Sequence, residues 1–170
     1  MNNLDQYRLG KDNEPLELST SEDNRQVVLA MAQQAQRSIY IMSGTLDPVI
    51  YDHQDLVEAL SRLARSHRHA EIHILLQDSE PVAKRGHRLV ELANRLSSMV
   101  SIRKPDEAYA HINEAFFIAD GVGFIKRTMA DRFEGVASFH SPMEARELAD
   151  HFNDIWSRAQ PDSQLRRLHL

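Results

Sequence analysis

The stretch His111-Ile-Asn-Glu-Ala-Phe-Phe-Ile-Ala-Asp120, followed by Gly121-Val-Gly-Phe-Ile-Lys-Arg127, decides the fold of this chain. Its apolar run from Ala115 to Ala119 is short and aromatic, which is typical of a buried strand. Asp120-Gly121 is a strong signal for a hairpin turn, and a second apolar segment follows it. The stretch is therefore predicted to form a β-hairpin at the structural centre of the protein.

Length and composition describe an ordinary globular domain. The chain has 170 residues, of which 42% are apolar and 26% charged, so neither disorder nor a membrane class is indicated. The N-terminus lacks the basic and apolar regions of a signal peptide, and no cysteine is present. The net charge of −5 argues against wholesale electrostatic binding to nucleic acid. We therefore expect a cytoplasmic protein without membrane insertion and without a nucleic-acid partner.

The first half of the chain alternates between helix and strand patterns. The expected order is helix 22–37, strand 38–43, helix 52–66, strand 71–77, helix 81–96 and strand 99–103. Thr20 and Asp23 have the spacing of a capping box for the first helix. Gly86 costs the third helix about 1 kcal/mol relative to alanine, so its regular part is expected to begin near Arg88. Strands joined by such helices are predicted to be parallel.

The second half is predicted to consist of antiparallel hairpins closed by a helix. After the central hairpin, Arg132–Phe139 is expected to be a strand with Gly135 as a bulge. Ser141 and Glu144 indicate a second capping box, starting a helix that runs to about Arg158. The last residues, Leu165–Leu170, are predicted to add an edge strand.

These elements predict an α/β fold. It has a single mixed β-sheet, parallel in the first half and antiparallel in the second, with helices on both faces. Residues 1–20 are expected to form an N-terminal arm, with a short strand or docking segment near Leu16 and Leu18. Residues 21–170 are expected to form the single domain.

Most familiar catalytic patterns are missing from the sequence. The histidines lack the usual spacing of metal ligands, and no H-x-x-x-H pattern lies on a predicted helix. Gly121-Val-Gly123 lies at a hairpin and does not open a helix, so it is no dinucleotide fingerprint. No G-x-S-x-G nucleophile elbow is present. We therefore predict no metal site, no cofactor and no catalytic residue of these types.

The polar residues around the central hairpin remain as candidates for ligand binding: His111, Asn113, Arg127, Arg132 and Glu134. Two arginines that converge at strand ends hold a phosphate or carboxylate well, because guanidinium groups bind such anions bidentately. The alternative is that Arg127 and Arg132 pair with Asp131 and Glu134 across the sheet. The residue pattern leaves both readings open.

The order of motifs resembles that of a phospholipase D-like domain. The resemblance rests on the strand Ser38–Ser43, the helical segment Leu56–Leu60 and the strand Glu71–Leu76 that leads to Asp78. Met99–Arg103 is similar to the strand that leads into that family's catalytic hairpin. Phe152-Asn-Asp-Ile-Trp156 resembles its closing helix, with a phenylalanine four residues before a tryptophan. The likeness covers about residues 22–158 and implies the same mixed-sheet fold.

The catalytic signature of that family is H-x-K, four residues and then aspartate. The resemblance implies a histidine nucleophile that forms a phospho-histidine and a lysine that holds phosphate oxygens. With Asp120 as the aspartate, the histidine position holds Asn113 and the lysine position holds Ala115. With His111 as the histidine, the aspartate position holds Ile118. The register on Asp120 keeps the strand-turn geometry and is preferred, and the family's later serine and asparagine are not evident after the hairpin.

The resemblance therefore implies a degenerate, non-catalytic member of the family. Its role would be binding or protein interaction, with a homodimer and a phosphate-bearing small molecule as the expected partners. The alternative is a phosphodiesterase with a displaced site, in which His111 is the nucleophile and Arg127 or Arg132 replaces the lysine. A nucleic-acid surface is a weaker alternative, carried by Arg85, Arg88, Arg166 and Arg167.

Overall fold

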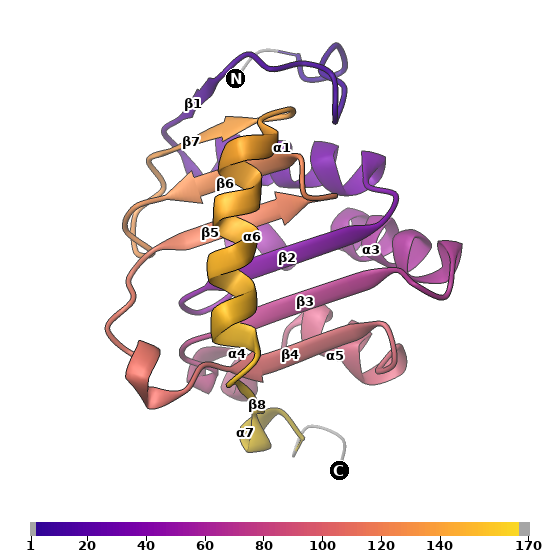
Figure 1. Cartoon of the computed structure of the whole chain (residues 1–170). Helices are drawn as coiled ribbons and strands as arrows, with labels where there is room; N and C mark the ends of the chain where they lie inside the picture. The colour runs from indigo at the N-terminus through magenta and orange to yellow at the C-terminus, as the bar shows by residue number, and fades with distance from the viewer. Residues whose placement is uncertain (1–2, 167–170) are drawn as a thin grey trace.

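A computed structural model describes residues 3–166 of the chain. Its centre is one eight-stranded sheet with the strand order β1-β7-β6-β5-β2-β3-β4-β8 (Figure 1). β2 (Ser38–Ser43), β3 (Glu71–Leu76) and β4 (Val100–Lys104) are parallel to one another. All other neighbouring strands in the described sheet are antiparallel. The predicted α/β fold with a single mixed sheet is confirmed.

The other elements complete the two halves of the sheet. The remaining strands are β1 (Leu16–Leu18), β5 (Ala115–Ala119), β6 (Gly123–Arg127), β7 (Gly135–Ser138) and β8 (Gln160–Pro161). The helices are α1 (Ser21–Gln34), α2 (Pro48–Tyr51), α3 (Gln54–Ser66), α4 (Glu80–Arg85), α5 (Arg88–Arg95), the 3-10 helix η1 (Glu107–Tyr109), α6 (Pro142–Trp156) and α7 (Ser163–Arg166). No helix within residues 3–166 is long and apolar enough to cross a membrane.

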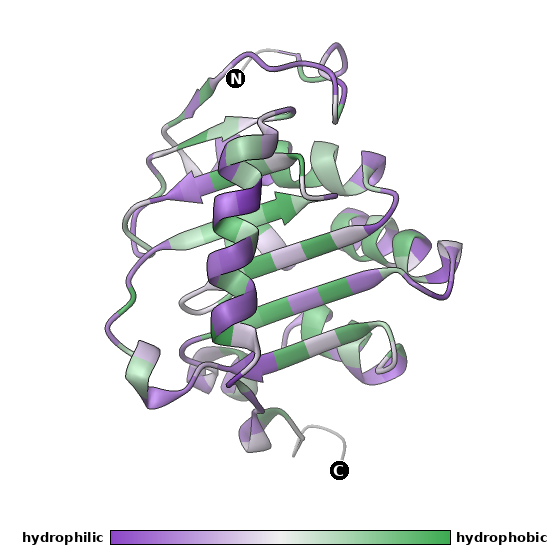
Figure 2. Ribbon diagram, in the orientation of Figure 1, coloured by the Kyte–Doolittle hydropathy of each residue, from purple (hydrophilic) through white to green (hydrophobic). Residues whose placement is uncertain are grey.

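Helices cover both faces of the sheet. α1, α3 and α5 lie on one face, and α6 alone crosses the other (Figure 1). Because side chains alternate along a strand, Phe117 of β5 enters the core under α1 and α3, whereas Phe116 and Ile118 enter the core under α6. All five residues of β5 are buried. On its outer side, α6 presents a largely hydrophilic surface to the solvent (Figure 2).

Aromatic stacking fixes α6 on the sheet. Phe152 stacks on Tyr40 of β2 with ring centroids 4.9 Å apart, and Trp156 stacks on His73 of β3 at 4.3 Å. The guanidinium of Arg103 in β4 lies 4.2 Å from the centre of the Trp156 ring. The Phe-Trp spacing that the sequence singled out therefore places both rings, one helical turn apart, over the parallel strands.

Two helix boundaries follow the predicted local chemistry. The capping box of α1 is present, because the Thr20 hydroxyl accepts a hydrogen bond from the Asp23 backbone at 3.0 Å and the Asp23 carboxylate accepts one from the Thr20 backbone at 3.1 Å. Gly86, with a φ of 78°, divides the expected helix 81–96. The regular part begins at Arg88, as predicted.

Three local predictions were wrong, although α6 begins directly after Ser141 as expected. Ser141 makes no capping bond to the backbone of α6, because its hydroxyl donates to the Glu144 carboxylate at 3.2 Å. The sixth predicted strand starts at Gly135, so Arg132 lies in the loop before it. The helix α7 includes residues 165 and 166, where the edge strand 165–170 was predicted to begin, and the rest of that predicted strand, 167–170, lies outside the described residues.

The N-terminal segment contacts the sheet. β1 pairs with β7 at the edge, which confirms a short strand near Leu16 and Leu18. Tyr7 is buried and stacks on Phe139 with ring centroids 5.5 Å apart. The division into an arm of residues 1–20 and a domain of residues 21–170 stays a prediction.

Candidate functional site

The β5–β6 hairpin ends in a tight turn that we call the anchored turn, Ala119–Val122. The backbone N–H of Val122 donates to the carbonyl of Ala119 at 3.1 Å. Asp120 and Gly121, the two central residues, have positive φ values of 54° and 69°. Type I′ turns need this backbone at both central positions, and Asp-Gly is among the sequences that adopt it most readily. The predicted hairpin is confirmed in place and in turn chemistry.

The carboxylate of Asp120 ties the anchored turn to the start of β2. It accepts hydrogen bonds from the backbone N–H groups of Gln36, Arg37 and Ser38, with shortest distances of 2.9, 2.8 and 3.1 Å. The guanidinium of Arg37 also donates to the carbonyl of Asp120 at 2.8 Å. Hydrogen bonds to an ionised acceptor are about twice as strong as neutral ones. Asp120 therefore works as a structural clamp between the hairpin and the parallel strands.

The other end of the hairpin, which we call the closed end, holds Asn113, Ala115, Arg127 and Asp47. Arg127 is the cross-strand partner of Ala115. Its side chain is only 4% exposed, and Nη2 lies 3.1 Å from a carboxylate oxygen of Asp47 in the loop after β2. The same nitrogen donates to the carbonyl of Ala130. A guanidinium and a carboxylate thus neutralise each other inside the protein at this end.

Three residues of the β6–β7 region, Gly135, Ala130 and Phe133, pack around Arg127 or close the space beside it. A Cβ at Gly135 would lie 2.5 Å from the Lys126 carbonyl oxygen and 3.1 Å from Cγ of Arg127, so no side chain fits there. The backbone N–H of Ala130 donates to the carbonyl of Asn113 at 2.7 Å, which ties the β6–β7 loop to the start of the hairpin. The Phe133 ring lies 5.6 Å from the guanidinium carbon. The β6–β7 loop therefore folds over the closed end.

Burial also affects the groups beside the ion pair. Burial raises the pKa of the Tyr51 phenol, with Arg127 lowering it and Asp47 raising it by smaller amounts. Nε of Arg127 is buried and has no hydrogen-bond partner among the described residues. Because the Arg127 side chain is almost fully buried, its positive charge depends on one carboxylate, that of Asp47, for compensation.

The loop that carries Asp47 is held by a buried histidine. The carbonyl of Leu46, a residue with a φ of 57°, accepts from Nε2 of His87 at 3.0 Å. Nδ1 of His87 accepts from the Leu89 backbone N–H at 3.0 Å and so caps α5. These two partners require the neutral ring with the proton on Nε2. Burial lowers the pKa of His87, which favours that same neutral form.

The structure separates the five predicted ligand residues. Arg127 is buried, whereas His111, Asn113, Arg132 and Glu134 are exposed. Ala130 links two of the five, because its N–H donates to the backbone carbonyl of Asn113 and its carbonyl accepts from Arg127. The alternative of ion pairing across the sheet was wrong, because Arg127 pairs with Asp47 and Arg132 makes no ion pair within residues 3–166. Ligand binding by any of the five stays a prediction.

A second polar cluster lies on the α6 face of the hairpin. Glu114 contacts Nε2 of His151 at 3.1 Å and Nζ of Lys126 at 3.8 Å, beside a pocket of about 280 Å³. The sequence analysis missed this cluster. A signal was present, because Glu114 and Lys126 share the side of the hairpin that carries Phe116 and Phe124, so they had to meet the closing helix.

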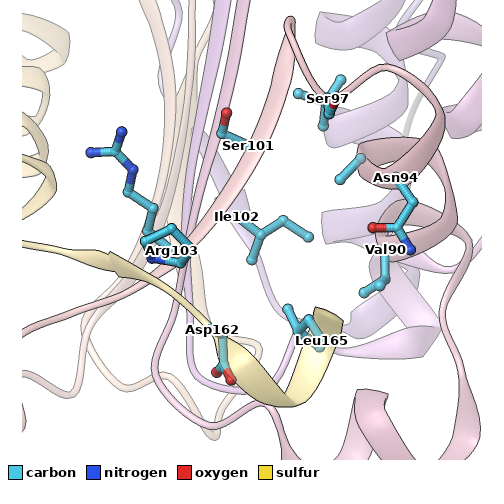
Figure 3. Close-up of a pocket in the computed structure, with 11 residues that line it drawn as sticks. Val90, Asn94, Ser97, Ser101, Ile102, Arg103, Asp162 and Leu165 are labelled. Carbon is cyan, nitrogen blue, oxygen red and sulfur yellow. The ribbon is translucent and has the colours of Figure 1, made fainter. Parts of the chain in front are cut away.

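A pocket of about 320 Å³ lies beside β4, where β8 pairs only with Arg103 and Lys104. Figure 3 shows Ile102 directed between β4 and α5 toward Val90 and Leu165, whereas the Arg103 guanidinium is directed away from them. The wall is mainly apolar. Within residues 3–166, no group of three or more histidine, aspartate or glutamate side chains is placed to hold a metal ion anywhere in the protein.

Several solved structures have a fold similar to that of this chain. Nuc from Salmonella typhimurium, a phospholipase D family member, is 18% identical, with a TM-score of 0.60 over 88% of this chain and 99% of Nuc. NucT from Helicobacter pylori is 10% identical, with a TM-score of 0.63 over 88% of this chain and 99% of NucT. TrmBL2, an archaeal chromatin protein with a novel mode of DNA binding, is 14% identical, with a TM-score of 0.64 over 89% of this chain and 55% of TrmBL2. At these identities the likeness shows the fold alone.

Sequence comparison points to one family. No curated protein matches the chain significantly. Residues 20–168 match the family described as a domain of unknown function, DUF7931. The chain therefore belongs to the DUF7931 family and has a phospholipase D-like fold.

Proposed function

We propose that this protein is a non-catalytic phospholipase D-like domain with a binding or protein-interaction role. The observation that carries the proposal is the buried ion pair between Arg127 and Asp47. It lies at the closed end, where Asn113 and Ala115 occupy the histidine and lysine positions of the preferred register. Ala115, in the lysine position, is directly opposite Arg127 in the hairpin.

The chemistry of the closed end supports this reading. Attack on a phosphodiester needs a nucleophile, and an asparagine amide is not one. Alanine supplies no charge to phosphate oxygens, and the guanidinium of Arg127 is already neutralised by Asp47. The Asp120 carboxylate is occupied by three backbone N–H groups. Each residue of the preferred register is thus unable to act on phosphate or serves the fold.

We propose that interaction with a second copy of the chain uses the surface around the closed end. Two large apolar side chains are exposed there, Val49 at 52% and Met129 at 42%. They adjoin Pro48 and Ala130, next to the groups that hold Arg127. Changing Val49 and Met129 to aspartate should shift a dimer toward monomer in light scattering, and a wild-type monomer would contradict this part of the proposal.

Hydrolysis of bis(p-nitrophenyl) phosphate tests the absence of catalysis. Wild type and His111→Ala are expected to give the same background rate. A wild-type rate clearly above background that is lost in His111→Ala would instead establish the displaced phosphodiesterase. Arg132→Ala serves as the matched variant for that outcome, because Arg132 is the exposed arginine which that mechanism needs.

A phosphate-bearing ligand at the closed end is the finer part of the proposal. It would have to displace Asp47 from Arg127, so Asp47→Asn should strengthen binding of inorganic phosphate if the site accepts anions at all. Heat exchange in calorimetry reports the result. Absence of phosphate binding in both proteins would leave protein interaction as the role of the domain.

A further inference from the structure

A groove between α3 and α5 gathers three arginine side chains, and we call it the arginine groove. Arg62 and Arg65 come from α3 and Arg95 from the last turn of α5. The groove has a volume of about 620 Å³, and Glu58 is the single acidic residue in its wall. The two helices are neighbours on the face of the sheet opposite α6 (Figure 1).

The three arginines are not paired with the acids nearest to them. Arg62 and Arg95 each have a glutamate four residues earlier, Glu58 and Glu91, which is the usual spacing for an ion pair within a helix. Neither pair forms, although Lys84 and Glu80 of α4 make such a pair at 2.8 Å. Among residues 3–166, none of the three guanidinium groups has an ion-pair or hydrogen-bond partner. The groove therefore has uncompensated positive charge.

Helix ends explain only part of this pattern. A cation in the last turn stabilises a helix through the helix dipole, and Arg65 and Arg95 lie in such turns. Arg62 lies a turn earlier, and no guanidinium of the groove donates to a terminal carbonyl in the described part of the chain. Helix stability alone therefore does not account for three arginines on one groove.

The charge and chemistry of the groove favour phosphate groups. Three arginines and one glutamate leave an excess of two positive charges. Planar guanidinium groups bind phosphate oxygens bidentately, and Ser61 and Gln54 add neutral donors to the same wall. We propose that the arginine groove binds a ligand that carries two or more adjacent phosphate groups.

This groove is independent of the closed end. The C-terminal half of α3 lies beside the start of β3, whereas Asp47 follows the end of β2, which runs parallel to β3. Arg65 and Arg95, in the last turns of α3 and α5, therefore lie toward the starts of the parallel strands, whereas Asp47 lies after the end of one of them. The proposal holds whether or not the closed end is inactive.

Calorimetric titration of the full chain with tripolyphosphate at low salt tests the proposal. Wild type is expected to bind, and Arg62→Gln with Arg65→Gln should weaken binding by at least about tenfold, because the variant loses two guanidinium groups that can form charge-assisted hydrogen bonds to phosphate oxygens. The matched control is Arg146→Gln with Arg158→Gln, which removes the same charge from two exposed arginines, on or just after α6, that have no ion-pair partner within residues 3–166. That control should bind within about twofold of wild type.

Two results would overturn the proposal. One is no binding of tripolyphosphate or of a short single-stranded oligonucleotide by wild type. The other is an equal loss in the groove variant and the control, which would show diffuse attraction to charge. If only the oligonucleotide binds through Arg62 and Arg65, the phosphate groups come from a nucleic-acid backbone; if tripolyphosphate binds as well or better, they come from a small molecule. Thermal unfolding of each variant confirms that it is folded.

Discussion

The two ends of the β5–β6 hairpin use acidic groups in opposite ways. At the anchored turn, the Asp120 carboxylate accepts hydrogen bonds from three consecutive backbone N–H groups at the start of β2. At the closed end, the Asp47 carboxylate neutralises one buried guanidinium, that of Arg127. The first arrangement joins two parts of the fold. The second occupies the region where a phospholipase D-like enzyme is expected to hold phosphate.

Under the proposed function, this contrast indicates which residues of the hairpin a non-catalytic domain still needs. A carboxylate that accepts from three backbone N–H groups at a sheet crossover stabilises the fold whatever the protein binds, because hydrogen bonds to charged groups are stronger than neutral ones. In this proposal, the catalytic histidine and lysine do not stabilise the fold, so their positions can hold Asn113 and Ala115 instead. Under the proposed function, the hairpin therefore keeps Asp120 and replaces the rest of the signature.

The largest loss of stability is expected from a substitution that disrupts the ion pair at the closed end. Asp47→Ala should lower the free energy of unfolding by about 3–5 kcal/mol, because it leaves the nearly buried guanidinium of Arg127 without its carboxylate partner. Urea-induced unfolding measures the loss. Adding Arg127→Met to Asp47→Ala removes the stranded charge and should recover most of the stability. If the single and double variants were equally unstable, Asp47 would stabilise the loop by some other contact.

The second prediction concerns a substitution that removes the hydrogen bonds of the anchored turn. Asp120→Ala should lower the free energy of unfolding by about 1–2 kcal/mol, because three backbone N–H groups, two of them exposed to water, lose a charged acceptor. Asp120→Asn keeps one acceptor oxygen and an Asn-Gly turn, so its loss should be roughly half as large. Urea unfolding again measures both. A loss below about 0.5 kcal/mol in Asp120→Ala would show that water replaces the carboxylate without cost.

Sequence patterns predicted the fold well because its determinants are local. The crossover units of the first half, the Asp-Gly hairpin turn and the break at Gly86 all depend on residues within a few positions of one another. Errors appeared where distant parts of the chain competed for a residue. The β6–β7 loop leaves the sheet pattern before Gly135 because its backbone bonds to Asn113 and its carbonyl at Ala130 binds Arg127.

The candidate site was only partly predictable for the same reason. The sequence placed Arg127 and Asn113 near one end of the hairpin, but it offered only Asp131 and Glu134 as acids for the arginines. The actual partner, Asp47, is 80 residues away from Arg127. No periodicity links the two, since their meeting depends on β5 pairing antiparallel with β2. Long-range ion pairs of this kind need the strand order before they can be inferred.

A smaller effect concerns the pH dependence of the loop at the closed end. Burial holds the pKa of His87 below its ordinary value, so as the pH falls the unfolded chain takes up a proton before the folded protein does. Stability from this group is therefore full above about pH 6.5, the ordinary histidine value, and is lost as the pH falls toward the folded pKa. Wild type should lose stability as the pH falls below about 6.5, and the loss should be smaller in His87→Asn. The exposed His69→Asn is the control, and an equal pH slope in all three proteins would contradict the role of His87.

The smallest effect compares two arginines five positions apart. Arg127 and Arg132 were predicted together as ligand residues, yet one is buried in an ion pair and the other is exposed without one in the described structure. Exposed residues without such partners usually change stability by less than about 0.5 kcal/mol when replaced. Arg132→Gln and Glu134→Gln should therefore leave the urea midpoint nearly unchanged, whereas Asp47→Ala lowers it strongly. A large loss in Arg132→Gln would mean that the β6–β7 loop depends on both arginines, and the closed end would then extend to the surface of the loop.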